Sequence, residues 1–298
     1  MGTRARLVTM AVTRADGLAT LASALEVLER TEVELSTWRD SSAISALNRH
    51  PAGSPWQAAP ALCRMFTEVW RWHAETGGAF DPAIGRLLGA WDVHGSGRRP
   101  TADAQRQAAA ASGLSLVAFD RTGCTLTRRG DVAIDAGAFG KGEALDRVEA
   151  VLGDAPWMID LGGQVKVGGD APDGGWTVAV ADPRHRDRPL LHVRLVDGSL
   201  STSGSSERDL TVDGGRIAHI FDPRTGTPAT FDGSVTVWHR SGLAADALST
   251  ALFVMGPDEG RRWADARGIA ALYLVPGRGG ATDTVATRAF RERFSAPE

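Results

Sequence analysis

The second half of the chain is a succession of short β-rich runs separated by Gly, Asp and Pro, and this pattern constrains the fold more than any other feature. One clear helical pattern, Leu243 to Met255, interrupts the runs, and a second helix is expected over 257–267. Because helices and strands do not alternate regularly, the pattern disfavours a doubly wound parallel sheet and favours an α+β fold. The expected strands are WMIDLGGQVKVGG, WTVAVADP, LLHVRLV, SLSTSG, IAHIFDP, SVTVWH and IAALYLV.

The first half of the chain combines one strand with several helices. Residues 5–12 predict a strand, and the helix that follows has Leu18, Leu21, Leu25 and Leu28 on one apolar stripe. The other expected elements are a loop with one helical turn over 36–55, a helix around 65–70 that ends at Gly77-Gly78, an Ala-rich helix up to Gly113, a hairpin in CTLTRRGDVAID, and a helix over 144–152.

The composition is that of a globular protein, with 43% hydrophobic and 23% charged residues among 298. The 33 basic and 36 acidic residues leave a net charge of −3, which gives no indication of a nucleic-acid partner. No apolar run reaches the roughly 18 residues of a membrane span, and the N-terminus has no signal-peptide core. We therefore expect a single domain over 1–298 with a weak boundary near 95–105, no membrane anchor, and a cytoplasmic location unless a leader has been removed.

Cys63 and Cys124 are the only cysteines in the sequence. They lack the C-x-x-C spacing of a zinc site, and two thiols do not make the disulfide framework of a small secreted protein. Both are predicted to be buried thiols that pack as small hydrophobic side chains.

The segment IDAGAFGKGEALD, residues 134–146, places glycines and a lysine between an apolar stretch and a helical one, a pattern typical of phosphate binding. It is not a P-loop, because Gly142 follows Lys141 where that motif needs Ser or Thr. It is not the dinucleotide fingerprint either, since the spacing is G-x-x-G-x-G. If this loop meets a phosphate, the metal must come from elsewhere in the chain.

The helix LAADALSTALFVM carries a candidate metal site. Asp246 and Thr250 are four residues apart, so they lie side by side on one helix face, and a carboxylate with a hydroxyl suits Mg²⁺. The alternative is an aspartate near the start of a helix that interacts with the dipole, beside an incidental threonine. His219, in an apolar strand before an Asp-Pro-Arg turn, is either a core residue or a proton carrier. Asp81 follows a double glycine that lets backbone approach a flat ligand.

Several sequence blocks occur in a fixed order along the chain. They are the N-terminal MGT, STWxxxSxISxLN (36–48), GAFDP (78–82), IDxGxxGKGxALD (134–146), DLGG through GGW (160–176), STSG (201–204), HIFDPRTGxP (219–228) and ADALSTALFVMG (245–256). Together they resemble the ApbE-type FAD:protein FMN transferases, which are bacterial flavin transferases. The resemblance extends to about Gly256, and HIFDPRTG and ADALSTALFVMG are its most specific blocks.

The resemblance implies an α+β, T-fold-like architecture, with mixed or antiparallel sheets flanked by helices and FAD in a central cleft. It implies a Mg²⁺-dependent enzyme that takes FAD as substrate, transfers FMN to a Thr or Ser hydroxyl of an acceptor flavoprotein, and releases AMP. The metal ligands of the family fall on Asp246, Thr250 and the backbone carbonyl of Gly140. The FAD contacts of the family fall on Met1, Trp38, Ala79, Phe80, Asp81, Gly137, Glu143 and Ile220, with Asn48 near the adenine or ribose and Lys141 placed to offset phosphate charge.

The acceptor hydroxyl must lose a proton during this transfer. His219 is the first candidate for the general base, because the pKa of histidine is naturally near neutrality. Asp246 is the second candidate, although a metal-bound carboxylate is a poorer base. Two other functions stay open at this point: an FAD pyrophosphatase that yields FMN and AMP, and a flavin-binding protein without turnover.

Overall fold

The computed structural model describes residues 3–169, 171–205, 210–212 and 214–294. The described residues form two compact units. Unit 1 comprises Met1–Glu32, Phe139–Ser206 and Phe231–Glu298, and unit 2 comprises Val33–Ala138 and Glu207–Thr230. Both units combine helices with antiparallel strand pairs, so the predicted α+β class is confirmed.

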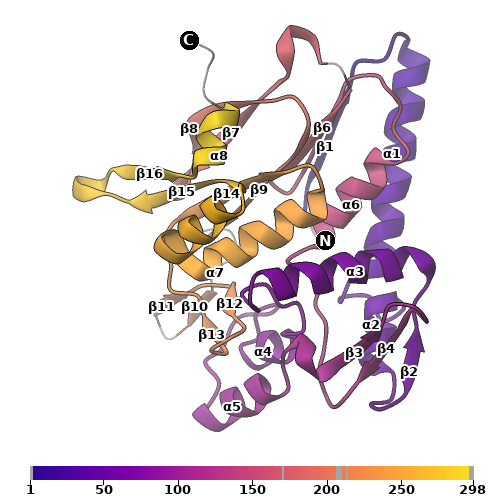
Figure 1. Ribbon diagram of the computed structural model, residues 1–298, viewed down its shortest axis with the longest axis vertical. Helices are drawn as coiled ribbons and strands as arrows, with labels where there is room; N and C mark the ends of the chain where they lie inside the picture. The colour runs from indigo at the N-terminus through magenta and orange to yellow at the C-terminus, as the bar shows by residue number, and fades with distance from the viewer. Residues whose placement is uncertain (1–2, 170, 206–209, 213, 295–298) are drawn as a thin grey trace. The chain divides into compact units, whose positions relative to one another are not determined.

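Unit 1 is built on a sheet that contains seven of the described strands, in the order β1-β5-β6-β9-β14-β15-β16 (Figure 1). Every neighbouring pair in this sheet is antiparallel. Its strands are β1 (Ala5–Thr9), β5 (Trp157–Leu161), β6 (Gln164–Gly168), β9 (Gly198–Gly204), β14 (Ser234–His239), β15 (Ala270–Pro276) and β16 (Thr282–Ala286). The other elements of unit 1 are most of α1 (Arg14–Leu35), α6 (Gly140–Glu149), η2 (Pro172–Gly174), β7 (Trp176–Asp182), β8 (His185–Leu195), α7 (Gly242–Ala266), η3 (Arg278–Gly280) and α8 (Arg288–Phe294).

Two layers cover the two faces of this sheet. On one face, Val167, Leu200 and Leu272 pack against the β7–β8 hairpin and α8 in one hydrophobic cluster. On the other face, β5 packs against α1 and α6, and α7 contacts β9, β14 and β15. Since side chains alternate across a strand, β9 presents Leu200 to the first face and its serines to α7.

Helix α7 contains the pattern that the sequence predicts as two helices. Ser241 is its N-cap, and the Ser241 hydroxyl accepts a hydrogen bond from the Ala244 amide at 3.2 Å. A kink divides the helix at Gly256, whose φ of 72° and ψ of 175° are not helical, and Pro257 follows. The predicted helices Leu243–Met255 and 257–267 are therefore the two arms of α7.

Unit 2 has four helices and three small antiparallel sheets among its described residues. Its elements are α2 (Ala43–Arg49), β2 (Pro55–Gln57), α3 (Pro60–Glu75), α4 (Gly85–Ala90), α5 (Ala102–Ala110), η1 (Leu114–Leu116), β3 (Val117–Asp120), β4 (Thr125–Arg128), β10 (Leu210–Val212), β11 (Gly215–Ile217), β12 (Phe221–Asp222) and β13 (Thr227–Pro228). Strand β4 pairs with both β2 and β3. Trp91 of unit 2 packs edge-on against Phe221, with ring centroids 5.6 Å apart.

Two local predictions are wrong. In α1, Leu18 and Leu25 are 57% and 45% exposed, because the side of the helix that packs on the core carries Ala24, Val27 and Leu28. The segment CTLTRRGDVAID is not a hairpin, since its strand β4 pairs back to β3 and its last residues lie outside any strand. In α1 the elements that decide which face is buried, α6 and β5, lie far along the chain, whereas the partner of β4 is β3, the strand just before it.

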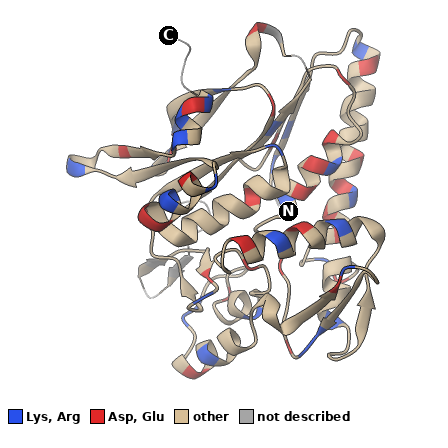
Figure 2. Ribbon diagram, viewed as in Figure 1, with Lys and Arg blue, Asp and Glu red and all other residues tan. Residues whose placement is uncertain are grey.

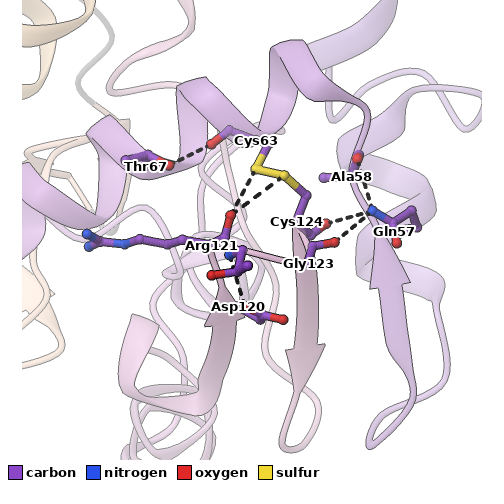
Figure 3. The surroundings of a disulfide bond; sticks show 9 residues. Gln57, Ala58, Cys63, Thr67, Asp120, Arg121, Gly123 and Cys124 are labelled. Atoms are coloured by element: carbon purple, nitrogen blue, oxygen red, sulfur yellow. Dashed lines mark hydrogen bonds between the residues drawn. A yellow bond between two sulfur atoms is a disulfide. The ribbon is translucent and has the colours of Figure 1, made fainter.

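The prediction of two buried thiols is also wrong, because Cys63 and Cys124 form a disulfide (Figure 3). Cys63 lies on α3 and Cys124 in the turn between β3 and β4. Their Cα atoms are 5.5 Å apart although the sequence separation is 61, a distance that suits a disulfide. Gln57 supports the same turn by donating to the Gly123 carbonyl at 3.0 Å.

The charged residues of α1 and α3 are of both signs and are interspersed (Figure 2). They form exposed pairs such as Arg30–Glu26 at 2.6 Å and Arg71–Glu75 at 4.0 Å. Pairs of this kind contribute little to stability. Among the described residues, none of the helices combines the length and the apolarity that a membrane crossing requires.

We predict that replacing both cysteines, in Cys63→Ser/Cys124→Ser, lowers the free energy of unfolding by about 2–4 kcal/mol, because the cross-link restricts the unfolded chain. Urea unfolding followed by tryptophan fluorescence measures the change. Reducing agent should destabilise the wild-type protein by a similar amount and leave the double variant unaffected. Equal stability of the two oxidised proteins would contradict the prediction.

Candidate functional site

Asp246 is a buried carboxylate at the contact between α6 and α7. Its exposed fraction is 3%. Lys141 places its Nζ 3.0 Å from one carboxylate oxygen, and the Gly142 amide donates to the other at 3.2 Å. A buried carboxylate needs such partners to stay charged. Lys141 and Gly142 of the GKG sequence therefore donate hydrogen bonds to Asp246, the residue that the sequence predicts as a metal ligand.

Thr250 lies one helical turn after Asp246, as the spacing of four predicts. Its hydroxyl donates to the Asp246 carbonyl at 3.1 Å. Because the hydroxyl hydrogen is engaged within the helix, the lone pairs of the oxygen point away from that carbonyl and are available to a ligand.

This donor set fits a hard cation. One carboxylate, one hydroxyl and one backbone carbonyl are oxygen ligands, which Mg²⁺ prefers, and Mg²⁺ proteins commonly use one or two carboxylates and leave the remaining positions to water and substrate phosphate. Within the described part of the chain, no group of three His, Cys, Asp or Glu side chains is placed to hold a metal. A magnesium site here would thus depend on Asp246 as its carboxylate.

The segment around Gly140 begins a helix. Gly140 is the first residue of α6, which is earlier than the predicted start near residue 144. The Glu143 amide donates to the Phe139 carbonyl at 2.9 Å, and the Glu143 carboxylate accepts from Arg147 at 2.6 Å. The amide end of α6 therefore lies in the segment that the sequence associates with phosphate.

Three buried serines lie beside Asp246; two of them belong to the STSG block, to which the sequence analysis assigned no role at the site. Ser201 and Ser203 of β9 lie 3.2 and 2.9 Å from the hydroxyl of Ser249 on α7, and Ser201 also lies 3.5 Å from Asp246. All three serines are buried. The signal was the alternation in SLSTSG, which places every second residue on one face of the strand.

Unit 2 contains a second buried carboxylate, Asp135, in the same IDAGAFGKG segment. Thr37 donates to it at 3.1 Å, the Gly137 amide at 2.7 Å, and His94 lies 3.2 Å away. Burial alone would raise the pKa of the Asp135 carboxyl, but these hydrogen bonds and the charge of His94 hold that pKa below its ordinary value. The sequence reading missed Asp135, Thr37 and His94.

Trp38 is an exposed aromatic ring beside this cluster. It is 68% exposed, and its ring meets the His94 ring edge-on at 5.0 Å. An exposed tryptophan supported from one side is suited to stacking on a flat ligand. Its predicted role in flavin binding stays a prediction.

Asn48 has a structural partner. Its side-chain amide exchanges two hydrogen bonds with the backbone of Ile134, both 2.8 Å long. This pairing fixes the backbone of Ile134, which directly precedes Asp135. The position of Asn48 near the adenine or ribose stays a prediction, and the structure gives the side chain a second role.

Asp81 is buried and is engaged within unit 2. Its carboxylate accepts from the Ala83 amide at 2.8 Å and the Leu114 amide at 2.9 Å, and His73 lies 3.3 Å away. Burial raises the pKa of the Asp81 carboxyl, and His73 with the two amides offsets part of that rise. Because the Ala79 and Phe80 side chains are also buried, a ligand contact at these positions would use the backbone.

His219 lies outside any strand, so the predicted strand IAHIFDP is wrong at this position. Within this segment Ile217 ends β11 and Phe221–Asp222 forms β12, and the Ile220 carbonyl accepts from the Ala229 amide at 2.8 Å. His219 and Ile220 are half-buried. Met1, another predicted FAD contact, lies outside the described residues.

The predicted site residues therefore fall into two groups. Unit 1 brings Lys141 to Asp246 and Thr250 at the α6–α7 contact, and it also contains Gly140 and Glu143 in the first turn of α6. Unit 2 contains the others that are described, namely Trp38, Asn48, Ala79, Phe80, Asp81, Gly137, His219 and Ile220.

Comparisons with known proteins extend over nearly the whole chain. Residues 1–273 match the ApbE family. A Klebsiella pneumoniae protein named FAD:protein FMN transferase is 31% identical over 288 residues, which cover 92% of this chain and 82% of that protein. A Treponema pallidum protein of the same name is 31% identical, with 87% and 77% covered.

Solved structures agree with these matches. The crystal structure of the ApbE protein from Thermotoga maritima has a TM-score of 0.90 and 29% identity, covering 99% of this chain and 97% of that chain. The flavin transferase ApbE from Vibrio cholerae has a TM-score of 0.86 and 27% identity, covering 99% and 96%.

We predict that Asp135→Asn lowers the free energy of unfolding at pH 7 by about 2 kcal/mol, because three donors lose a charged acceptor. The pKa of Asp135 is lower in the folded protein than in the unfolded one. Its stabilisation is therefore present above the unfolded pKa of about 3.9 and is lost as pH falls through the folded value.

Urea unfolding of both proteins at several pH values between 7 and 3 checks this expectation. The difference between wild type and variant should shrink toward the acid end. A difference that is constant over this range would show that the charge of Asp135 contributes nothing.

Proposed function

This chain belongs to the ApbE family, and from that premise we propose that it is an FAD:protein FMN transferase. In this reaction the FMN half of FAD moves onto a Thr or Ser hydroxyl of an acceptor flavoprotein, and AMP is released. The main support is the buried Asp246, which meets Lys141 and Gly142 of the glycine-lysine segment in a chain about 31% identical to proteins of that name.

Asp246, Thr250 and the Gly140 carbonyl would hold Mg²⁺. When bound, Mg²⁺ supplies positive charge that stabilises negative charge on phosphate oxygens. Lys141, with its Nζ at Asp246, has the reach to contact a phosphate beside the same carboxylate. The amide end of α6 adds a partial positive charge in the same segment.

The remaining predicted contacts are assigned to FAD. Trp38 would stack on a flat ring of the ligand, and its edge contact with His94 fixes its orientation. The predicted contacts are Met1, Trp38, Asn48, Ala79, Phe80, Asp81, Gly137, Lys141, Glu143 and Ile220. Of these, Ala79, Phe80 and Gly137 would act through their backbone atoms.

His219 is assigned as the general base. The acceptor oxygen forms a bond to the phosphorus of the FMN half, the bond from that phosphorus to the oxygen shared with AMP breaks, and the hydroxyl proton moves to His219. AMP leaves with the bridging oxygen. Asp246 is the weaker candidate for the base, because Lys141 and Gly142 already occupy its oxygens.

The disulfide bears on where the enzyme works. Disulfides persist in oxidising compartments and are rare in the cytoplasm. The bond between Cys63 and Cys124 therefore favours an oxidising compartment over the cytoplasmic location expected from the sequence.

We predict that Asp246→Asn lowers the rate of FMN transfer at least about a thousandfold, because a neutral amide holds Mg²⁺ poorly. Mass spectrometry of a threonine-bearing acceptor incubated with enzyme, FAD and Mg²⁺ measures the covalent FMN. The control is Asp258→Asn, at an exposed aspartate farther along α7, which should keep full activity. Full activity in Asp246→Asn would refute the metal site. If the wild-type protein instead releases AMP and free FMN without labelling the acceptor, it is an FAD pyrophosphatase.

We predict that His219→Ala lowers the transfer rate by about a hundredfold or more while FAD binding is retained, because general bases contribute roughly 10²–10⁴ to rates. Single-turnover transfer and a separate FAD titration distinguish the two effects. His192→Ala, at an exposed histidine of β8, is the matched control. An unchanged rate would exclude His219 as the base.

A further inference from the structure

Asp146 accepts four hydrogen bonds at the start of α7. Its Oδ1 accepts from the Gly242 amide at 2.6 Å and from Lys166, and its Oδ2 accepts from the Leu243 amide at 3.0 Å and the Ser241 hydroxyl at 2.7 Å. A carboxylate has about four lone-pair sites, so this one is fully used. Asp146 thereby satisfies two of the amides that the first turn of a helix leaves without partners.

The lysine on this carboxylate is completely buried. Lys166 is 0% exposed, and its Nζ also contacts Glu149 at 2.8 Å and the Arg240 carbonyl at 3.0 Å. A buried ammonium is retained only where anions and acceptors surround it. Lys166 thus connects β6 to Asp146 on α6 and to Arg240, just before α7.

The first turn of α7 is also held from the other side. The Gly242 carbonyl accepts from Gln164 at 2.9 Å. A Cβ on Gly142 would overlap this same carbonyl, so α6 and α7 meet backbone to backbone. Asp246 follows one turn later and accepts from the Gly142 amide. Any displacement of the first turn therefore moves Asp246 relative to Lys141 and Gly142.

We propose that Asp146 is a positioning residue for the metal site: it fixes the first turn of α7 on α6 and so holds Asp246 and Thr250 where they bind Mg²⁺. The inference rests on the proposed function, because that function makes Asp246 and Thr250 metal ligands. Asp146 acts on Asp246 and Thr250 through the first turn of α7, whose Gly242 and Leu243 amides it accepts from. Ser241 and Lys166 donate to the same carboxylate and help to hold it in place. Geometry of this kind must be held within about 0.5 Å for a site to work.

The test is a titration of each protein with Mn²⁺ alone, followed by electron paramagnetic resonance. Asp146→Asn replaces an acceptor oxygen with a donor that faces donors, and it should weaken Mn²⁺ binding about tenfold, at the lower end of the effect of altering groups around a metal site. Ser241→Ala, a milder change that removes one donor to Asp146 and the N-cap acceptor of the Ala244 amide, should weaken it by less than about tenfold. Asp258→Asn, at an exposed aspartate of α7 outside this network, should change it less than twofold and is the matched control.

A second readout separates positioning from general destabilisation. In the transfer assay, Asp146→Asn should raise the KM for Mg²⁺ about tenfold while kcat at saturating Mg²⁺ stays within about threefold of wild type. Asp246→Asn should stay inactive at every Mg²⁺ concentration. If Asp146→Asn does not fold, Ser241→Ala decides the question by the same two measurements.

The outcomes distinguish the two claims. If Asp246→Asn abolishes Mn²⁺ binding and both Asp146→Asn and Ser241→Ala leave it unchanged, the positioning role is overturned and the metal site stands. If Asp246→Asn itself leaves Mn²⁺ binding unchanged, the metal site is refuted and the positioning role falls with it.

Discussion

The backbones of α6 and α7 touch at Gly142 and Gly242, and the site in unit 1 depends on this contact. A Cβ on Gly142 would overlap the Gly242 carbonyl, and one on Gly242 would lie 2.6 Å from the Gly142 carbonyl oxygen. Because no side chain separates the two helices, the Asp246 carboxylate reaches the Gly142 amide directly. The GKG sequence, which alone suggests phosphate, is thus also required by helix packing, and Lys141 between the glycines is held at the buried carboxylate.

Much of the fold could be predicted because strong periodicity survives in the folded chain. The predicted strands around β14 and β15 and the two arms of α7 are confirmed. The failures share one cause. Leu18 and Leu25 are exposed because Ala24, a small residue that the stripe omitted, faces α6 and β5. The disulfide joins residues 61 apart, and nothing local to either cysteine shows that α3 packs on the β3–β4 turn.

The candidate site divides in the same way. Asp246 and Thr250 could be found because one helix carries both at a fixed spacing. Asp135 could not be found in this way, since its partners Thr37 and His94 are 98 and 41 residues away along the chain. Lys166 lies 20 residues from Asp146 and reads as an ordinary charged residue within a strand. Sequence spacing identifies chemistry carried by one element, whereas the residues that support it are identified only by tertiary contacts.

The proposed metal site has a single carboxylate, which suits a pyrophosphate substrate. Mg²⁺ keeps near-octahedral geometry and commonly takes one or two carboxylates from the protein and other oxygens from phosphates. The proposed site with Asp246, Thr250 and one carbonyl would therefore leave coordination positions for the substrate, whereas a cage of acidic residues would fill them. Lys141 fits this arrangement, because within the chain it already offsets the charge of Asp246. In the proposed reaction Asp246 and Thr250 would hold the metal ion, and the Lys141 ammonium beside Asp246 would add positive charge next to the substrate phosphates.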